Sequence, residues 1–413
     1  MKNEPETSNT QQARTEAPSV WRIGIAAVFL GLALSAAYWY WDTETAPPSH
    51  NASAQPPTEA ELTLPEDGIH TDAFSVKLLQ AALKEEKGNV TVAPSAVTEV
   101  ILGLQAVDGK SIEETCRQFG LQSQEPSAAT LPRHYLQIFV DENQQVGLEN
   151  RSLMTIPIKR DSVQASAFIN RLVLPQDQVT DLVVKASDID PEDQFITAID
   201  QSFDASWLHP INRQHTTMLP FTTTVGMPDT PTMRVAELYR VAQAPDDTWE
   251  AVALLFKRSA TAAEDTPEDD WVSLVIVRPK VGTARRMAEK LTAEQVSEIR
   301  KALVEAPARP YNLQLPPLRI DVPSTDILPQ LQKMGINPQP LSREGDNAGQ
   351  QARGSVFLQY RIRACESPGQ DGKSAVESVE GYPLLRINSS YLWWIGGMTS
   401  PAPFLYMGVV EQP

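Results

Sequence analysis

Histidine, cysteine and carboxylate side chains supply most catalytic and metal sites, and their spacing in this chain indicates neither. No GxSxG nucleophile motif, P-loop or GxGxxG followed by a helix occurs. The carboxylates of Glu264–Asp270 fall in an expected hairpin loop, where a solvated tip is favoured over catalysis. The five histidines show no HExxH or other metal spacing; they are His50, His70, His134, His209 and His215. We therefore expect no enzyme activity, no cofactor and no metal.

Composition excludes two further classes of protein. The net charge of -17 leaves no phosphate-neutralising surface, so we expect no nucleic-acid partner. Two cysteines, Cys116 and Cys365, are too few for a disulfide framework or a structural zinc site. They could pair once, although two buried thiols are favoured. A hydrophobic content of 41% is enough for a sizeable core.

One apolar stretch, Ile23–Trp41, carries no charged residue and is long enough to span a bilayer. Trp21 lies at one end and Tyr38–Trp41 at the other, where aromatic rings prefer the membrane interface. A cleavable signal peptide is the alternative. It is disfavoured because the leader is polar and contains Pro18, and because the stretch ends in bulky aromatics. The pattern therefore predicts a single transmembrane anchor.

The distribution of basic residues predicts the orientation of this anchor. Lys2, Arg14 and Arg22 precede it, whereas Lys77 is the first basic residue after it. The positive-inside rule then keeps the N-terminus in the cytoplasm and places the rest in the periplasm or outside the cell, as in a bacterial inner-membrane protein. The expected parts are a cytoplasmic segment 1–22, a transmembrane helix 23–41, a Pro-rich disordered linker 42–66 and a folded domain 67–413.

The folded domain begins with helices and continues mainly with strands. Amphipathic patterns and caps predict helices over 72–86, 94–109 and 111–119. Tyr391–Trp394 belongs to an expected core strand and is not an exposed binding patch. Without βαβ alternation, the order of elements indicates an α+β domain. Later helices are expected at 166–174 and 284–304, the second split near Thr292, and strands at 135–140, 195–207, 271–277, 313–322, 356–364, 392–395 and 404–409.

Six segments in sequence order resemble the serpin family across nearly all of 72–413. They are NVTVAPSAVTEVILGLQAVDGKSIEETCRQFGL (89–121), FDASWLHPINRQHT (203–216), LTAEQVSEI (291–299), YNLQLPPLRIDVPSTDILPQLQKMGI (311–336), Asp346–Gly349 and FLYMGVVEQP (404–413). The resemblance implies a serpin-like domain, with helices packed on large mixed and antiparallel sheets. It also implies a mechanism in which a serine protease cleaves an exposed loop, which then inserts as a strand and traps the acylated enzyme.

The resemblance places the hinge of this loop at Gly369, Gln370, Asp371, Gly372, Lys373, Ser374, Ala375 and Val376. Inhibitory relatives have small, Ala-rich residues here, because the hinge must become a buried strand. The loop is also about four residues shorter than an inhibitory one. Since a strand rises roughly 3.3 Å per residue, full insertion of this loop would fall short of that of an inhibitory relative. The family's sheet-opening region matches Ala93, Ala96, Ile199, Trp207 and Gln359. All of these except Trp207 stand where Ser, Asn and His would be usual.

The candidate reactive bond lies among Leu384, Leu385 and Arg386. Arg386 suits a trypsin-like protease, and either leucine suits a chymotrypsin-like or elastase-like one. The same residues could instead begin the next strand. Two functions follow from the resemblance: a membrane-tethered serine protease inhibitor, or a non-inhibitory serpin-fold scaffold that binds an unknown protein partner. In both cases we expect a monomer.

Overall fold

The structure is a computed structural model, and its described residues belong to one compact unit within 64–413. They are residues 68–107, 133–141, 153–174, 182–204, 206–208, 211, 215–256, 272–336, 353–364, 381–398 and 404–413. None of the helices in these ranges has both the length and the apolar character needed to cross a membrane. The expected anchor 23–41, the linker 42–66, the expected helix 111–119 and both cysteines lie outside them.

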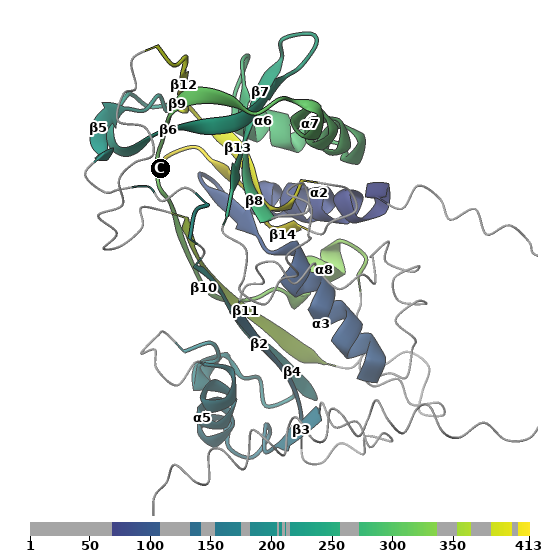
Figure 1. Cartoon of the computed structure of the whole chain (residues 1–413). Coiled ribbons are helices and arrows are strands. Elements are labelled where there is room, and N and C mark those ends of the chain that lie inside the picture. The colour runs from purple at the N-terminus through teal and green to yellow at the C-terminus, as the bar shows by residue number, and fades with distance from the viewer. Residues whose placement is uncertain are drawn as a thin grey trace, which may run out of the picture. The chain divides into compact units, whose positions relative to one another are not determined.

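A nine-stranded sheet forms the upper part of the domain in Figure 1. Its order is β1-β14-β13-β8-β7-β6-β9-β12, with β5 paired to β6. Trp393 and Trp394 on β13 are fully buried, as expected of a core strand. The strands are β1 (Val90–Val92), β5 (Thr217–Pro220), β6 (Asp229–Gln243), β7 (Trp249–Leu255), β8 (Val272–Pro279), β9 (Arg309–Leu315), β12 (Leu384–Arg386), β13 (Tyr391–Gly397) and β14 (Phe404–Val410).

A five-stranded sheet contains the longest strands of the lower part in Figure 1. Its order is β10-β11-β4-β2-β3. β11 pairs with β10 in antiparallel and with β4 in parallel orientation, and β2 is antiparallel to β4 and parallel to β3. The strands are β2 (Arg133–Asp141), β3 (Leu153–Ile156), β4 (Phe195–Asp204), β10 (Leu318–Asp326) and β11 (Gly354–Ala364).

One expected strand is corrected by the structure. The stretch 313–322 is two strands, because β9 ends at Leu315 and β10 begins at Leu318. Pro316 and Pro317 lie between them, and a proline cannot donate a hydrogen bond to a sheet. The chain therefore leaves the nine-stranded sheet at this point and enters the five-stranded one.

Three of the helices begin where a polar side chain accepts a hydrogen bond from a free backbone amide. The Thr292 hydroxyl accepts from the Gln295 amide in a capping box, which splits the expected helix 284–304 into α6 and α7 as predicted. Asp161 caps α5 by accepting from the Gln164 amide. The helices are α2 (Gly68–Glu85), α3 (Pro94–Val107), α5 (Ser162–Val173), α6 (Ala284–Glu289), α7 (Ala293–Glu305) and α8 (Leu328–Lys333), with a short 3-10 turn η1 (Ala186–Asp188).

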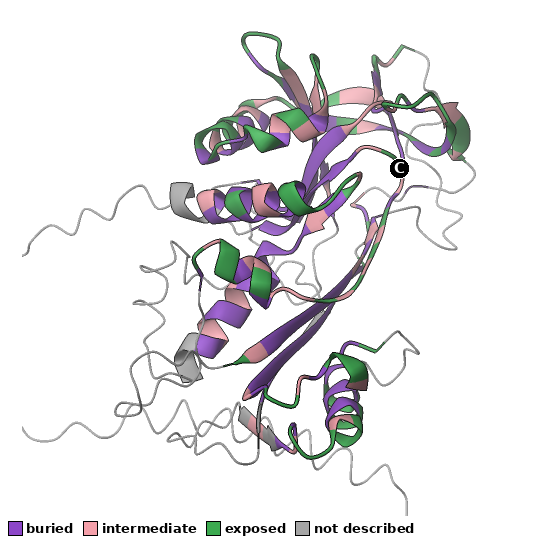
Figure 2. Cartoon of the chain, turned by 180° about the vertical axis from the view of Figure 1, so that it is seen from behind, coloured by how far each residue is buried: buried purple, intermediate pink, exposed green. Residues whose placement is uncertain are grey.

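Two hydrophobic clusters cover the two faces of the five-stranded sheet. The larger joins one face to the nine-stranded sheet and to α2, α3 and α7. The smaller lies under α5 on the opposite face and includes Phe139, Ile196 and Phe357. Figure 2 shows the resulting burial along the strands of both sheets. The central strands β4 and β11 are therefore covered on both faces.

Candidate functional site

The centre of the five-stranded sheet is a parallel pair between two strands that are far apart in sequence. β4 and β11 are in register from Gly354 opposite Phe195 to Arg363 opposite Asp204. Since both strands also have an antiparallel neighbour on the other side, this seam is the only place among these five strands where two long strands run in the same direction. A strand running the opposite way would fit between them as an ordinary antiparallel neighbour of both.

The chain leaving β11 could supply that strand. β11 ends at Ala364, and the next described strand, β12, begins at Leu384 in the other sheet. A segment that follows β11 and turns back along it would run antiparallel to β11 and also to β4. The topology thus has a position for one more strand between β4 and β11, which is closed while these two strands pair. The chain that could form this strand continues directly from β11.

Helix α5 and the residues Val183 and Val184, together called the strap, lie over one face of this seam. Asn170 on α5 accepts hydrogen bonds from the amides of Val183 and Val184, at 2.7 and 3.1 Å, and donates to the Val184 carbonyl. The Ser324 hydroxyl on β10 donates to the Val183 carbonyl. The strap therefore connects α5 to β10 across the face of β4 and β11, and an added strand beneath it requires these contacts to move.

A buried polar network joins the two seam strands on the face that carries α5. The Gln359 amide on β11 donates to the Asp200 carboxylate on β4 at 3.0 Å, and the Arg361 guanidinium pairs with the same carboxylate at 3.2 Å. Asp200 is 1% exposed. Burial raises the pKa of Asp200, while the charge of Arg361 and the two hydrogen bonds oppose this rise.

A second set of polar contacts joins the two strands at the end where their pairing begins. The Ser355 hydroxyl on β11 donates to the buried Asp193 carboxylate at 2.9 Å. Arg353 pairs with Asp190 at 2.5 Å and also with Glu192. Burial raises the pKa of Asp193 to about 6, with the Ser355 hydrogen bond acting in the opposite direction. Polar contacts therefore hold the two strands together in the middle and at one end.

The comparisons with known proteins identify this arrangement. A family model of serpins (serine protease inhibitors) matches residues 134–344, slightly more than half of the chain. This chain belongs to the serpin family. No curated protein matches it. The α+β serpin fold expected from the sequence is confirmed, and serpins are mostly inhibitors rather than catalytic enzymes.

Solved serpin structures match most of the chain at low identity. Human glycosylated kallistatin is 15% identical, with a TM-score of 0.64 over 84% of this chain and 97% of that one. Mouse protein-Z dependent protease inhibitor is 16% identical, with a TM-score of 0.61 over 84% and 97%. Manduca sexta serpin-12 is 17% identical, with a TM-score of 0.61 over 84% and 99%. At these identities the likeness shows the fold alone.

The structure of this serpin places the expected sheet-opening residues in three locations. Ile199 and Gln359 lie on the seam strands, opposite Leu358 and Asp200 respectively. Trp207 lies three positions beyond β4 and stacks on Phe256, with ring centroids 4.6 Å apart. Ala93 and Ala96 are buried at the start of α3, in the cluster that also contains Ile199. All five residues are buried, and two of them border the seam.

The candidate reactive-bond residues Leu384, Leu385 and Arg386 form β12 in this serpin. They pair in parallel with Asn312, Leu313 and Gln314 on β9. Leu384 is 58% exposed, whereas Leu385 is 4% exposed. Arg386 also donates to the Pro220 carbonyl at 3.3 Å. A protease would therefore reach Leu384 more readily than Leu385. The hinge residues 369–376 lie outside the described residues.

Sequence reasoning missed Asp200 and Arg361, the charged members of the seam network. The strand FITAIDQSFD contains one interior acid directly after the mainly apolar stretch FITAI, and VFLQYRIR contains an interior arginine. A charge in the middle of a buried strand requires a partner of opposite charge. This signal could have identified the two residues as a pair, although Arg361 lies 161 positions after Asp200 in the sequence.

Proposed function

We propose that this serpin is a membrane-tethered serine protease inhibitor that acts by presenting a loop and inserting it between β4 and β11. The observation that carries the proposal is the parallel β4–β11 pair, closed along ten residue pairs and followed directly by the connection to β12. Relatives of the same fold include proteins named as protease inhibitors, from mouse and from Manduca sexta. The targets would be serine proteases with trypsin-like, chymotrypsin-like or elastase-like specificity.

Insertion would give a large gain in backbone hydrogen bonding. A strand that pairs with β11 on one edge and β4 on the other makes bonds along both edges, whereas the closed seam offers only one set. At a net value of about 1 kcal/mol per bond, a ten-residue insertion gains on the order of 10 kcal/mol. The stretch 365–383 between β11 and β12 is long enough to contain such a strand once the loop is cut.

The alternation of a strand decides which hinge residues can be tolerated. Asp371 and Lys373 would point to one face, and Gln370 and Gly372 to the other. One face of the seam carries Asp200 and Arg361 beside α5, and the other meets the main hydrophobic core. Insertion therefore requires the charged hinge residues to lie on the α5 face, where partners of opposite charge are present.

Membrane tethering is the second part of the proposal and rests on the sequence. The apolar stretch Ile23–Trp41 is preceded by Lys2, Arg14 and Arg22 and followed by no Lys or Arg before Lys77, which supports a single span with the N-terminus in the cytoplasm. The inhibitor domain would then act in the periplasm or outside the cell, at the end of the linker 42–66. Alkaline extraction of membranes tests this: full-length protein should stay in the pellet and a 42–413 variant should not.

Protease trapping provides the decisive experiment. Detergent-solubilised full-length protein is incubated with trypsin, chymotrypsin and elastase, and the products are separated by SDS electrophoresis. An SDS-stable adduct with the combined mass of serpin and protease is expected for at least one of them. Cleavage of the loop without an adduct for any protease would count against trapping.

A second function is favoured by specific observations on the same site. The seam is locked by the charged network of Asp200 and Arg361, and β12 is already paired with β9. These contacts suit a scaffold whose loop is never inserted and which binds a protein partner instead. The two functions differ in one measurement, since a scaffold keeps its unfolding temperature after loop cleavage, whereas an inserting serpin gains tens of degrees.

A further inference from the structure

A cavity of about 360 Å³ lies between the two sheets, on the face of the five-stranded sheet opposite α5. Its walls come from α2, β1, β10, α8 and the end of β14, and its inner wall includes Leu358 and Tyr360 of β11. The volume is in the range of small-molecule sites in proteins. The cavity is partly open to solvent, so a small ligand could enter it.

Two of the inward-facing residues of β10 keep exposed apolar surface beside the cavity. Leu318, Ile320 and Val322 point to the same side of the strand, and Ile320 and Val322 are only half-buried. Arg319 and Asp321 alternate with them and are exposed, and Asp321 is paired with Arg363 at 2.7 Å. The cavity is thus bordered along β10 by the apolar side chains of Ile320 and Val322, which a ligand would cover, and by the charged side chains of Arg319 and Asp321.

Of the two acidic side chains that line the cavity, Glu86 and Asp321, only Glu86 lies beside the buried Tyr360. Glu86 follows α2 and lines the cavity. Burial raises the pKa of the Tyr360 hydroxyl, which donates to the Thr91 carbonyl at 2.6 Å, and the Glu86 charge raises it further. Desolvation raises the pKa of Glu86 itself, with Arg285 acting in the opposite direction from a distance. Glu86 is exposed and therefore lies at the rim of the cavity, close enough to act electrostatically on the tyrosine.

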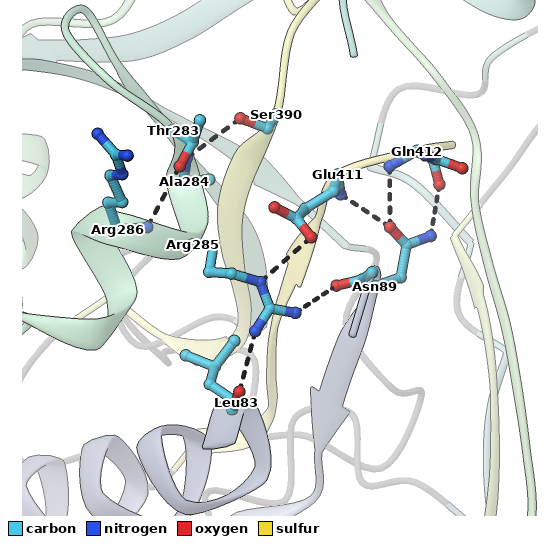
Figure 3. Close-up of polar contacts among 10 residues, drawn as sticks. Leu83, Asn89, Thr283, Ala284, Arg285, Arg286, Ser390, Glu411 and Gln412 are labelled. Carbon is cyan, nitrogen blue, oxygen red and sulfur yellow. Dashed lines mark hydrogen bonds and ion pairs between the residues drawn. The ribbon is translucent and has the colours of Figure 1, made fainter. Parts of the chain in front are cut away.

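The arginine nearest to Glu86 is engaged elsewhere. Arg285 donates to the carbonyls of Leu83 and Gly88, at 3.0 and 2.9 Å, and pairs with Glu411 at 3.2 Å (Figure 3). Within the described residues, no ion pair to the Glu86 carboxylate is formed by Arg285 or by any other cation. A cationic group from outside the protein would meet an acidic partner at the rim of a cavity whose walls are both apolar and polar.

We infer that this cavity is a binding site for a small amphipathic amine, with the apolar part against β10 and β11 and the ammonium group at Glu86. The volume limits the ligand to a molecule of roughly ten to fifteen non-hydrogen atoms. A carboxylic acid of the same shape is disfavoured because it would place a second negative charge beside Glu86. The site is independent of loop insertion and holds whether or not the protein inhibits a protease.

Three probes of one shape test the inference: 4-phenylbutylamine, 4-phenylbutanol and 4-phenylbutyrate. Binding to the full chain in lipid nanodiscs is measured by calorimetry, with empty nanodiscs as the blank. The amine should bind saturably at one site and about fivefold more tightly than the alcohol. This ratio corresponds to the free energy of a partly exposed charge pair, about 1 kcal/mol. The acid should bind most weakly. Equal affinity for amine and acid, or no saturable binding of the amine, overturns the inference.

Variants locate the site. Glu86→Gln should reduce amine affinity to that of the alcohol and leave the alcohol unchanged. The matched control is Glu85→Gln, since Glu85 is exposed, pairs with Lys333 and does not line the cavity. Ala82→Phe, which adds a ring to the cavity wall on α2, should abolish binding of both probes. If Glu86→Gln and Glu85→Gln weaken amine binding equally, the amine does not bind at this cavity.

Discussion

The side-chain amide of Gln359 on β11 donates a 3.0 Å hydrogen bond to the buried carboxylate of Asp200 on β4. The two residues are directly opposite each other in the register of the parallel pair. Any strand that enters the seam must first break this contact and the Arg361 pair beside it. The network therefore contributes both to native stability and to the barrier against sheet opening.

Gln359→Leu should make the seam easier to open. The substitution removes one hydrogen bond to a buried charge, so the free energy of unfolding should fall by about 1–2 kcal/mol. A synthetic peptide with the sequence of residues 369–376 should insert faster into the Gln359→Leu variant than into the unmodified protein. Fluorescence of a labelled peptide measures this rate. Gln243→Leu is the control, because Gln243 is an exposed amide that bonds Glu250 away from the seam. Equal insertion rates for the two variants would contradict a locking role for Gln359.

Most strands and helices could be predicted from the sequence, whereas the partners of Asp200 could not. The strands of the two sheets are recognisable from apolar runs such as WVSLVIV, and the α6–α7 boundary from the local cap at Thr292. These signals are local. The partners of Asp200 lie far along the chain, and only the register of two non-adjacent strands brings them together. The hinge 369–376, which decides the mechanism, was found through resemblance alone and lies outside the described residues.

Asp193→Asn should change the pH dependence of stability. The pKa of Asp193 is raised to about 6 in the folded protein, from an ordinary value of 3.8. The stabilisation linked to this shift is fully present below about pH 4 and is lost as the pH rises through about 6. Relative to the Asn variant, the unmodified protein should therefore lose about 1 kcal/mol of unfolding free energy between pH 4 and pH 7.

Urea unfolding at a series of pH values measures this difference. Other titrating groups, including Asp72, are present in both proteins and cancel in the comparison. Asp188→Asn serves as the control, since Asp188 is exposed on the neighbouring 3-10 turn. The prediction is wrong if the stability difference between the unmodified protein and the Asp193 variant is constant across this pH range.

Arg300→Met should be the most destabilising of these substitutions. Arg300 on α7 pairs with Asp72 on α2 at 3.0 Å, and both side chains are almost fully buried. The guanidinium also lies 4.0 Å above the ring of Phe404. Removing the arginine leaves a buried carboxylate without its partner, which costs about 3–5 kcal/mol. The double variant Asp72→Leu with Arg300→Met should recover most of this loss, because no unpaired charge remains.

A double-mutant cycle in urea checks the coupling between Asp72 and Arg300. Lys301→Ala is the control, since Lys301 is exposed and forms only a surface pair with Glu305 at 3.9 Å. Its effect should stay below about 1 kcal/mol. Additive losses in the double variant would show that the buried pair does not act as a unit.

Arg285→Ala should loosen the contact between α2, α6 and the segment that follows β14. Three groups lose a charged donor at once: the Leu83 and Gly88 carbonyls and the Glu411 carboxylate (Figure 3). Hydrogen bonds to charged groups are worth about 1.5–3 kcal/mol, so a loss of about 2 kcal/mol is expected for the partly exposed set. The neighbouring Arg286 is exposed, and its alanine variant should stay within about 0.5 kcal/mol of the unmodified protein.

Hydrogen exchange locates the effect of Arg285→Ala. The amides of Glu411 and Gln412 donate to the Asn89 side chain at 2.7 and 2.9 Å, beside the Arg285 contacts. Because Arg285 holds Glu411 and the Gly88 carbonyl in place, these two amides should exchange faster in the Arg285 variant and at the normal rate in the Arg286 variant. If both arginine variants cost the same stability and leave exchange at Glu411 and Gln412 unchanged, the guanidinium contacts do not anchor this segment.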